Sequence, residues 1–242
     1  ASDTMYDVPG RLLVNDPYTT MTIAGFNGGN GIWMTRDGLN FNTTPEWVRL
    51  DNAPAGTGTK AVEFTVNVEP EAGNHMFVSG WDGKLYRFDG MEDIHTQDDV
   101  PANMGKQIRS LGATITGVSV DPNDPNHVVI SVGGYGALAT GKVQETFNAL
   151  DEQPAWSSIW NVSGLSKMPC YDVVIDAMDP TGQSIVVGTE YGIFATENGG
   201  DDWVMANQNM ASTSDQITAP VFDVKQQWRG ASAWINPSNQ GA

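Results

Sequence analysis

The sequence predicts an all-β protein built as a β-propeller, and two sets of regularly spaced glycines carry this prediction. In the first set a glycine closes a short apolar run, and its members are Gly25, Gly80, Gly133 and Gly188. In the second set a glycine opens the next apolar run, at Gly31, Gly83, Gly136 and Gly192. Successive members are 55, 53 and 55 residues apart in the first set and 52, 53 and 56 in the second. Two markers that keep the same period indicate an internal structural repeat.

Each repeat contains runs with strand composition. A first run ends in an acidic and proline-containing turn, at Leu12 to Pro17, Phe64 to Pro70, Thr116 to Pro122 and Val173 to Pro180. These runs are rich in Val, Ile, Thr and aromatic residues, which favour pleated and half-buried surfaces. The two glycine-marked runs supply the second and third strands, as at Gly136 to Thr140, and a fourth strand follows, as at Trp203 to Ala206. Four short antiparallel strands per repeat are typical of a propeller blade.

Other repeat architectures fit the pattern less well. No apolar period of 3.6 residues persists along the chain, which excludes helical repeats. A β-sandwich has closely spaced strands but lacks this strict self-similarity. We therefore expect residues 1–242 to form one propeller segment with about four four-stranded blades. Their approximate ranges are 10–62, 63–113, 114–168 and 169–217, followed by an incomplete fifth unit at 218–242.

The fifth unit begins with Ala219 to Val224, and no glycine-marked hairpin follows it. An open arc of blades leaves sheet edges unpaired, and such edges are prone to association. Either residues near the N-terminus complete the last blade, or the arc belongs to a larger propeller. We expect the second arrangement, within a longer chain or a larger assembly.

Charge and composition exclude several functions. The chain has 12 Lys and Arg against 29 Asp and Glu, a net charge of −17. Such a surface repels phosphate backbones and anionic lipid, so we expect no nucleic-acid partner. No apolar run approaches the roughly 18 residues of a membrane span, so we expect no membrane insertion.

The metal-binding and nucleophilic residue types give no motif. The single cysteine, Cys170, precedes an apolar run and is expected to be a buried, inert thiol. His75, His95 and His127 have no cysteine or acid at ligand-like or triad-like spacing. We therefore expect no cofactor and no bound metal. Calcium binding is left open by the sequence, and no motif supports it.

One segment carries a family resemblance. The run from Thr196 to Trp203 resembles the Asp-box of BNR, sialidase-like and sortilin-like propellers, Ser/Thr-x-Asp-x-Gly-x-Thr-Trp, with Asn198 in the Asp position. The run from Thr35 to Phe41 is similar to a version one residue shorter, and the run from Thr140 to Phe147 to an eroded one. The resemblance implies a structural turn away from the ligand face. Its expected residues are Thr35, Asp37, Gly38 and Phe41, and Thr196, Asn198, Gly200 and Trp203.

The resemblance also suggests a setting. The glycine-rich repeats look similar to the surface proteins of Bacteroidota-type bacteria, so we expect a secreted or cell-surface location. Propellers of this kind serve as glycosidases, receptors, assembly factors and adhesive modules. The function we expect is a non-catalytic binding or scaffold module that engages protein or glycan partners.

The alternative is a glycoside hydrolase of the sialidase-like or xyloglucanase-like type. A sialidase needs arginines that converge on a carboxylate, but none of the six arginines lies in the Phe-Arg-Ile-Pro motif of that family. The xyloglucanase-like type uses two carboxylates across a cleft. The candidates Asp82, Asp121 and Asp176 recur at comparable repeat positions, which favours a role in turns. We therefore assign no catalytic residue and consider enzymatic activity the weaker hypothesis.

Aromatic residues offer the best candidates for ligand binding. Phe26, Trp81, Tyr135 and Tyr191 each follow the glycine or the short turn that ends the second strand of a blade. The repeat therefore places one aromatic residue per blade at the same end of the propeller. These rings either stack on a ligand or pack between blades, and the sequence leaves both roles open.

Overall fold

The computed structural model describes residues 2–6, 20–25, 31–37, 44–51, 58–64, 75–136, 138, 140–207 and 219–226. These residues form four antiparallel sheets of four strands each, and within each sheet the strands follow chain order. The prediction of an all-β protein with repeated four-stranded units is therefore confirmed. The helical residues described are two single 3-10 turns, η2 (Met91–Asp93) and η3 (Gln97–Asp99).

The first sheet contains β1 (Ser2–Tyr6), β2 (Thr20–Gly25), β3 (Ile32–Thr35) and β4 (Val48–Asp51). The second contains β5 (Thr59–Phe64), β6 (Met76–Gly80), β7 (Lys84–Phe88) and β8 (Gly105–Ser110). The third contains β9 (Ile115–Asp121), β10 (Asp124–Val132), β11 (Val143–Thr146) and β12 (Ser157–Ser158). The fourth contains β13 (Cys170–Ile175), β14 (Ile185–Thr189), β15 (Gly192–Thr196) and β16 (Val204–Met205).

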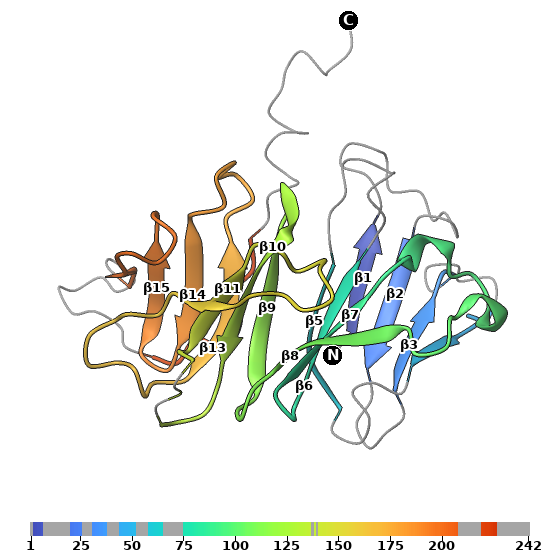
Figure 1. The fold of residues 1–242 in the computed structure, drawn as a ribbon, viewed down its shortest axis with the longest axis horizontal. Helices are drawn as coiled ribbons and strands as arrows, with labels where there is room; N and C mark the ends of the chain where they lie inside the picture. Colours follow the sequence, from blue (N-terminus) through green and yellow to red (C-terminus); the bar gives the residue numbers. More distant parts are fainter. Residues whose placement is uncertain are drawn as a thin grey trace, which may run out of the picture.

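The sheets stand next to one another in sequence order, from the blue first sheet at the right of Figure 1 to the orange fourth sheet at the left. The first strand of each sheet lies beside the first strand of the next, so that β5, β9 and β13 are neighbours. Hydrogen bonds cross these junctions: Ser79 Oγ of β6 donates to Ile115 O of β9 at 3.1 Å, and Ile175 N of β13 donates to Ser119 Oγ of β9 at 3.0 Å. A row of four-stranded antiparallel sheets fits the propeller-like arrangement that the sequence predicts.

Each pair of neighbouring sheets encloses its own apolar core, because successive side chains of a strand point to opposite faces. On β6, Met76 and Val78 pack into the core shared with the first sheet, while Phe77 packs into the core shared with the third. On β10, Ile130 faces the second sheet and Val129 faces the fourth. The middle strands of the second and third sheets therefore contribute to two cores each.

Polar side chains fasten the same junctions. In each junction one side chain from the earlier repeat donates hydrogen bonds to backbone carbonyls just after the third strand of the next sheet, at 2.6–3.0 Å. The donors are Arg36, Arg87 and Asn161, and their acceptors lie in Met91 and Ile94, in Ala149 and Asp151, and in Gly200 and Asp201. Arg36 and Arg87 therefore join neighbouring sheets and are not available to bind the carboxylate of a sialidase substrate.

Three boundaries differ from the sequence prediction. The third strand of the third sheet is Val143–Thr146, whereas the glycine spacing placed it at Gly136 to Thr140. Gly136 has φ +105° and belongs to a long β10–β11 loop, so a constant loop length was the wrong assumption. The first and second sheets also start before their predicted ranges, with β1 at Ser2 and β5 at Thr59. The predicted strand from Leu12 to Pro17 lies outside the described residues.

Residues 219–226 form no strand but run along the inner edge of the fourth sheet. Val221 N donates to Thr189 O at 2.9 Å, and Val224 N donates to the Asp172 carboxylate at 2.8 Å. A Cβ at Gly188 would lie only 2.6 Å from Val221 O, so this segment approaches the sheet where a side chain is missing. The segment therefore occupies the place that the inner strand of a following sheet has in the other junctions.

Among the described helical turns, none has the length and apolar character needed to cross a bilayer.

Candidate functional site

The predicted box turn at Thr196 is held by side-chain to backbone hydrogen bonds. Thr196 Oγ1 donates to Asn198 Oδ1 at 2.8 Å and accepts Gly200 N at 3.0 Å, while Asn198 Oδ1 accepts Asp202 N at 2.9 Å. Trp203 Nε1 donates to Ile159 O of the third repeat at 2.7 Å. All of these contacts are internal, and they close a turn onto the preceding sheet.

The same turn occurs in two other sheets. In the first sheet, Asp37 lies beside Thr35 and accepts a hydrogen bond from Glu46 N at 3.1 Å. In the third sheet, Asn148 Oδ1 accepts hydrogen bonds from Thr146 Oγ1 at 2.8 Å and from Ala155 N at 2.9 Å. The third box thus starts at Thr146, and its predicted position at Thr140 to Phe147 was wrong because the loop before β11 is longer. A tryptophan directly precedes the fourth strand in each of these sheets, at Trp47, Trp156 and Trp203. Gly38 and Phe41 lie outside the described residues.

Three of the predicted ligand-binding aromatics lie in equivalent loops, and the fourth, Phe26, is outside the described residues. Trp81 follows β6, Tyr135 follows β10 and Tyr191 follows β14. Their exposed fractions are 52%, 77% and 46%, so none is a plug between sheets. The ring of Trp81 packs against the Lys60 ammonium, whose Nζ lies 5.4 Å from the ring centroid.

Backbone contacts show that these loops share one end of the sheets. Thr114 Oγ1 donates to Trp81 O, and Thr114 O accepts Gly133 N, two residues before Tyr135; both distances are 3.0 Å. In turn Gly136 N donates at 3.1 Å to Lys167 O, which lies three residues before β13. We call the exposed or half-buried side chains along this end the platform: Trp81, Tyr135, Tyr171, Glu190, Tyr191 and Phe222.

Three members of the platform were not found from the sequence. Tyr171, on β13, donates its hydroxyl to the Glu190 carboxylate, and its ring lies 4.6 Å from that of Phe222 at a 45° tilt. Phe222 is 67% exposed and comes from the segment that lies along the fourth sheet. Burial and the hydrogen bond to Glu190 raise the pKa of the Tyr171 phenol, and a hydrogen bond to Glu190 also raises that of Tyr135. The two phenols therefore stay protonated and share one carboxylate.

Lys142 lies beneath this end and is buried. Its Nζ donates to Gly133 O at 3.2 Å and to Gly134 O at 2.7 Å, which fixes the loop that carries Tyr135. Burial lowers the pKa of Lys142 and raises that of the neighbouring Cys170 thiol to about 12. Cys170 is fully buried.

The three candidate catalytic carboxylates lie in turns. Asp82 accepts Lys84 N at 3.2 Å, Asp121 accepts Asn123 N at 2.8 Å, and Asp176 accepts Met178 N at 2.8 Å. Each bond spans two residues, which is the local turn geometry that Asp side chains favour. Within the described part of the chain, no three His, Cys, Asp or Glu side chains gather as metal ligands.

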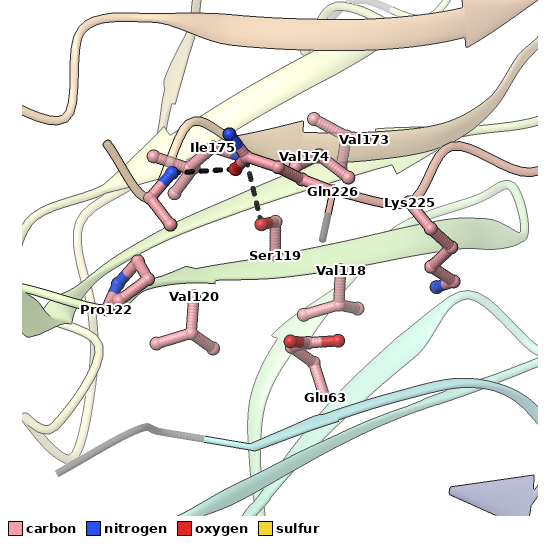
Figure 2. A pocket seen from close by; sticks show the side chains of 11 residues that line it. Glu63, Val118, Ser119, Val120, Pro122, Val173, Val174, Ile175, Lys225 and Gln226 are labelled. Carbon is pink, nitrogen blue, oxygen red and sulfur yellow. Dashed lines mark hydrogen bonds between the residues drawn. The ribbon is translucent and has the colours of Figure 1, made fainter. Parts of the chain in front are cut away.

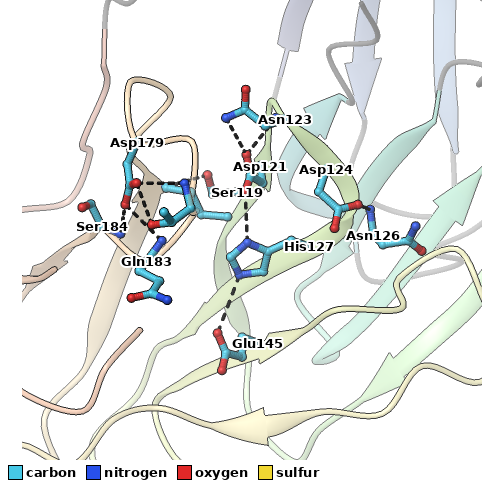
Figure 3. A network of polar contacts seen from close by, with 12 residues as sticks. Ser119, Asp121, Asn123, Asp124, Asn126, His127, Glu145, Asp179, Gln183 and Ser184 are labelled. Carbon is cyan, nitrogen blue, oxygen red and sulfur yellow. Dashed lines mark hydrogen bonds and ion pairs between the residues drawn. The ribbon is translucent and has the colours of Figure 1, made fainter. Parts of the chain in front are cut away.

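The structure does place acids beside a histidine, which the sequence spacing did not indicate. His127 Nδ1 lies 3.3 Å from Asp121 Oδ2, and its Nε2 lies 3.6 Å from Glu145 Oε2 (Figure 3). Burial opposes the charged form, but the two carboxylates raise the pKa of His127 to about 9. The imidazole is buried and stacked on Phe147 at 4.4 Å, so a substrate has no access to it. The strand register of β9, β10 and β11 creates this group, which is structural.

A hollow lies between the inner strands β5, β9 and β13, beside residues 225–226 (Figure 2). Glu63, Ser119, Val174 and Gln226 are among its lining residues, and its volume is about 100 Å³. Sites for small organic ligands measure roughly 300–1,000 Å³. This hollow has room for a few water molecules, so the platform is the better candidate site.

No protein-family model matches the chain, and no curated protein matches its sequence. Solved structures do resemble it. An ancestral GH74 enzyme matches with a TM-score of 0.53 and 17% identity, over 86% of this chain and 24% of that one. The GH74 xyloglucanase from Xanthomonas campestris matches with a TM-score of 0.50 and 16% identity, over 78% of this chain and 28% of the enzyme.

A third match is the extracellular domain of a hybrid two-component system from B. thetaiotaomicron, with a TM-score of 0.49 and 12% identity, over 84% of this chain and 23% of that one. The chain spans about a quarter of the length of these three structures. At such identity the GH74 likenesses show the fold alone, a β-propeller-like all-β arrangement.

Proposed function

We propose that this chain is a non-catalytic binding or scaffold module that engages a protein or glycan partner through the platform. The observation that carries the proposal is the gathering of exposed rings at one end of the sheets: Trp81, Tyr135, Tyr191 and Phe222. Aromatic rings give large contact area with few rotatable bonds, and they are enriched where proteins bind partners. Polar groups beside the rings, as on Glu190 and Tyr171, supply orientation.

The setting of this module is part of the proposal. We infer that the four sheets are consecutive blades of a larger propeller of the Asp-box kind, exported to the cell surface or medium by a Bacteroidota-type bacterium. The recurring box turns at Thr35, Thr146 and Thr196 support the first statement. The second rests on the resemblance of the glycine-rich repeats to surface propellers. The proposed binding needs no cofactor.

Glycoside hydrolysis is the second candidate, and the likeness of the fold to GH74 enzymes is the observation that favours it. Hydrolysis needs two carboxylates that flank a sugar bond. Asp82, Asp121 and Asp176 are engaged in turns, so the described residues offer this reaction little support.

The test compares the parent chain with a Trp81→Ala/Tyr135→Ala/Tyr191→Ala variant on a glycan array and a displayed peptide library. The expected result is a set of ligands that bind the parent and are lost by the variant. The matched control is Phe147→Ala, which removes a ring of 62% exposure from the β11–β12 side of the third sheet. Equal binding by the parent and the triple variant would refute the proposal. Release of sugar from sialosides or β-glucans, dependent on one carboxylate, would establish the hydrolase instead.

A further inference from the structure

Glu190 is a carboxylate without a basic partner among the described residues. Its carboxylate accepts the Tyr171 hydroxyl; burial and this bond raise the pKa of Tyr171, and a hydrogen bond to the same carboxylate raises the pKa of Tyr135. Lys142, which is buried beneath this end, donates to the carbonyls of Gly133 and Gly134. The platform therefore holds a negative charge that neutral phenols stabilise.

Aromatic side chains lie beside Glu190, and the Tyr171 and Tyr135 hydroxyls hydrogen-bond to its carboxylate. Tyr171 and Phe222 are in ring contact at 4.6 Å, Tyr135 is 77% exposed, and Tyr191 follows Glu190 directly in the chain. An aromatic face carries partial negative charge and attracts cations. The Glu190 carboxylate and the rings beside it therefore favour binding of a cation over binding of a neutral group.

Other aromatic faces of this protein already have cations above them. Lys60 lies over Trp81, Arg49 over Trp33 and Arg109 over Trp156, at 5.4, 5.9 and 5.5 Å from the ring centroids. Within the described part of the chain, no basic side chain lies over Tyr135, Tyr171, Tyr191 or Phe222. Among the described residues, Tyr135, Tyr171, Tyr191 and Phe222 thus lack the basic side chain that Trp33, Trp81 and Trp156 each have.

We propose that the platform binds an arginine side chain of a partner protein, with its guanidinium on Glu190 and its plane against the tyrosine and phenylalanine rings. This inference rests on the proposed binding function and names its ligand chemistry. Arginine is favoured over lysine because its planar guanidinium both forks onto a carboxylate and stacks on a ring. The net charge of −17 adds long-range attraction for a basic partner. A neutral glycan would gain nothing from that charge.

The test is an NMR titration of the full chain with ¹³C-labelled tyrosine rings. The probes are capped Gly-Arg-Gly, its lysine and citrulline counterparts, and cellohexaose as a neutral glycan. Two variants carry the argument: Glu190→Gln keeps an acceptor for the Tyr171 hydroxyl, and Glu197→Gln removes one charge from an exposed position in the Thr196 box turn. Both change the net charge equally, so they separate the local site from diffuse attraction.

The expected result is that the arginine peptide shifts the tyrosine ring signals and that citrulline does not. Glu190→Gln should weaken arginine binding by about tenfold, since it removes a charge-assisted bond and the cation's counter-charge. Glu197→Gln should change binding by less than about twofold. Equal losses in the two variants, or equal binding of citrulline, would overturn the inference. If cellohexaose alone binds and the ring-deleted variant loses it, the proposed function stands while this inference fails.

Discussion

Replacing Arg87 by methionine should remove one fastening between the second and third sheets. The guanidinium is buried, and its Nη1 donates to Ala149 O at 2.6 Å and to Asp151 O at 2.9 Å. Methionine fills much of the volume but donates nothing, so these carbonyls lose their charged donor. The variant therefore measures how much the hydrogen bonds of Arg87 contribute to stability while the apolar core of the junction is kept.

The expected cost follows from these bonds. Leaving a buried acceptor without a partner costs about 1–3 kcal/mol, and two are affected, one of them only partly buried. Asp89, which also pairs with Arg87 at 2.7 Å, keeps His75 and Lys106 and adds little. We expect the free energy of unfolding to fall by about 3 kcal/mol, a large share of the roughly 5–15 kcal/mol typical of a domain.

Urea unfolding, followed by tryptophan fluorescence, measures this loss. The control is Lys106→Met, which removes an exposed partner of the same Asp89 at 2.8 Å and should cost less than about 0.5 kcal/mol. If Arg87→Met cost under about 1 kcal/mol, or no more than the lysine control, the hydrogen bonds of Arg87 would contribute little to the junction.

Three further outcomes are expected. Gly200→Ala should lower the free energy of unfolding by about 2 kcal/mol, because Gly200 has φ +90° and a Cβ would lie 2.7 Å from Ile159 O. Gly199→Ala is the control and should cost about 1 kcal/mol, because Gly199 has φ +66° but open space around a Cβ. Equal losses in thermal unfolding would contradict the steric argument. Because the pKa of His127 is raised to about 9, its contribution to the free energy of unfolding should be complete below pH 6.5 and lost as the pH rises through about 9. His127→Gln should abolish this loss of stability between pH 6.5 and 9, and an unchanged stability profile would argue against it. Cys170 should react with a thiol reagent only after unfolding, and rapid labelling of the native chain would contradict its burial.

Much of the fold could be predicted because glycine marks the strand ends where a side chain would obstruct. The apolar run from Met76 to Gly80 coincides with β6, and the run from Gly192 to Thr196 coincides with β15. The prediction failed where a loop length changed. Between β10 and β11 the chain makes an additional excursion held by Lys142, which a fixed period cannot represent.

The site was predictable only in part. The period indicated Trp81, Tyr135 and Tyr191, because each follows the second strand of its repeat. Tyr171 and Phe222 join them through tertiary packing between segments some 50 residues apart, which no local pattern records. The same holds for His127, whose acid neighbours lie 6 and 18 residues away and meet it through strand register.

The two-faced middle strands determine how such a molecule opens. Because β6 and β10 each contribute to two cores, neither the second nor the third sheet can detach without exposing apolar side chains on both faces. Stability in stacked repeats is close to a sum of nearest-neighbour terms. Amide hydrogen exchange should consequently be slowest in β6 and β10 and faster toward β16, where Val204 is 64% exposed. The platform rings therefore lie on strands with different expected exchange rates. Trp81 directly follows β6, where exchange should be slowest.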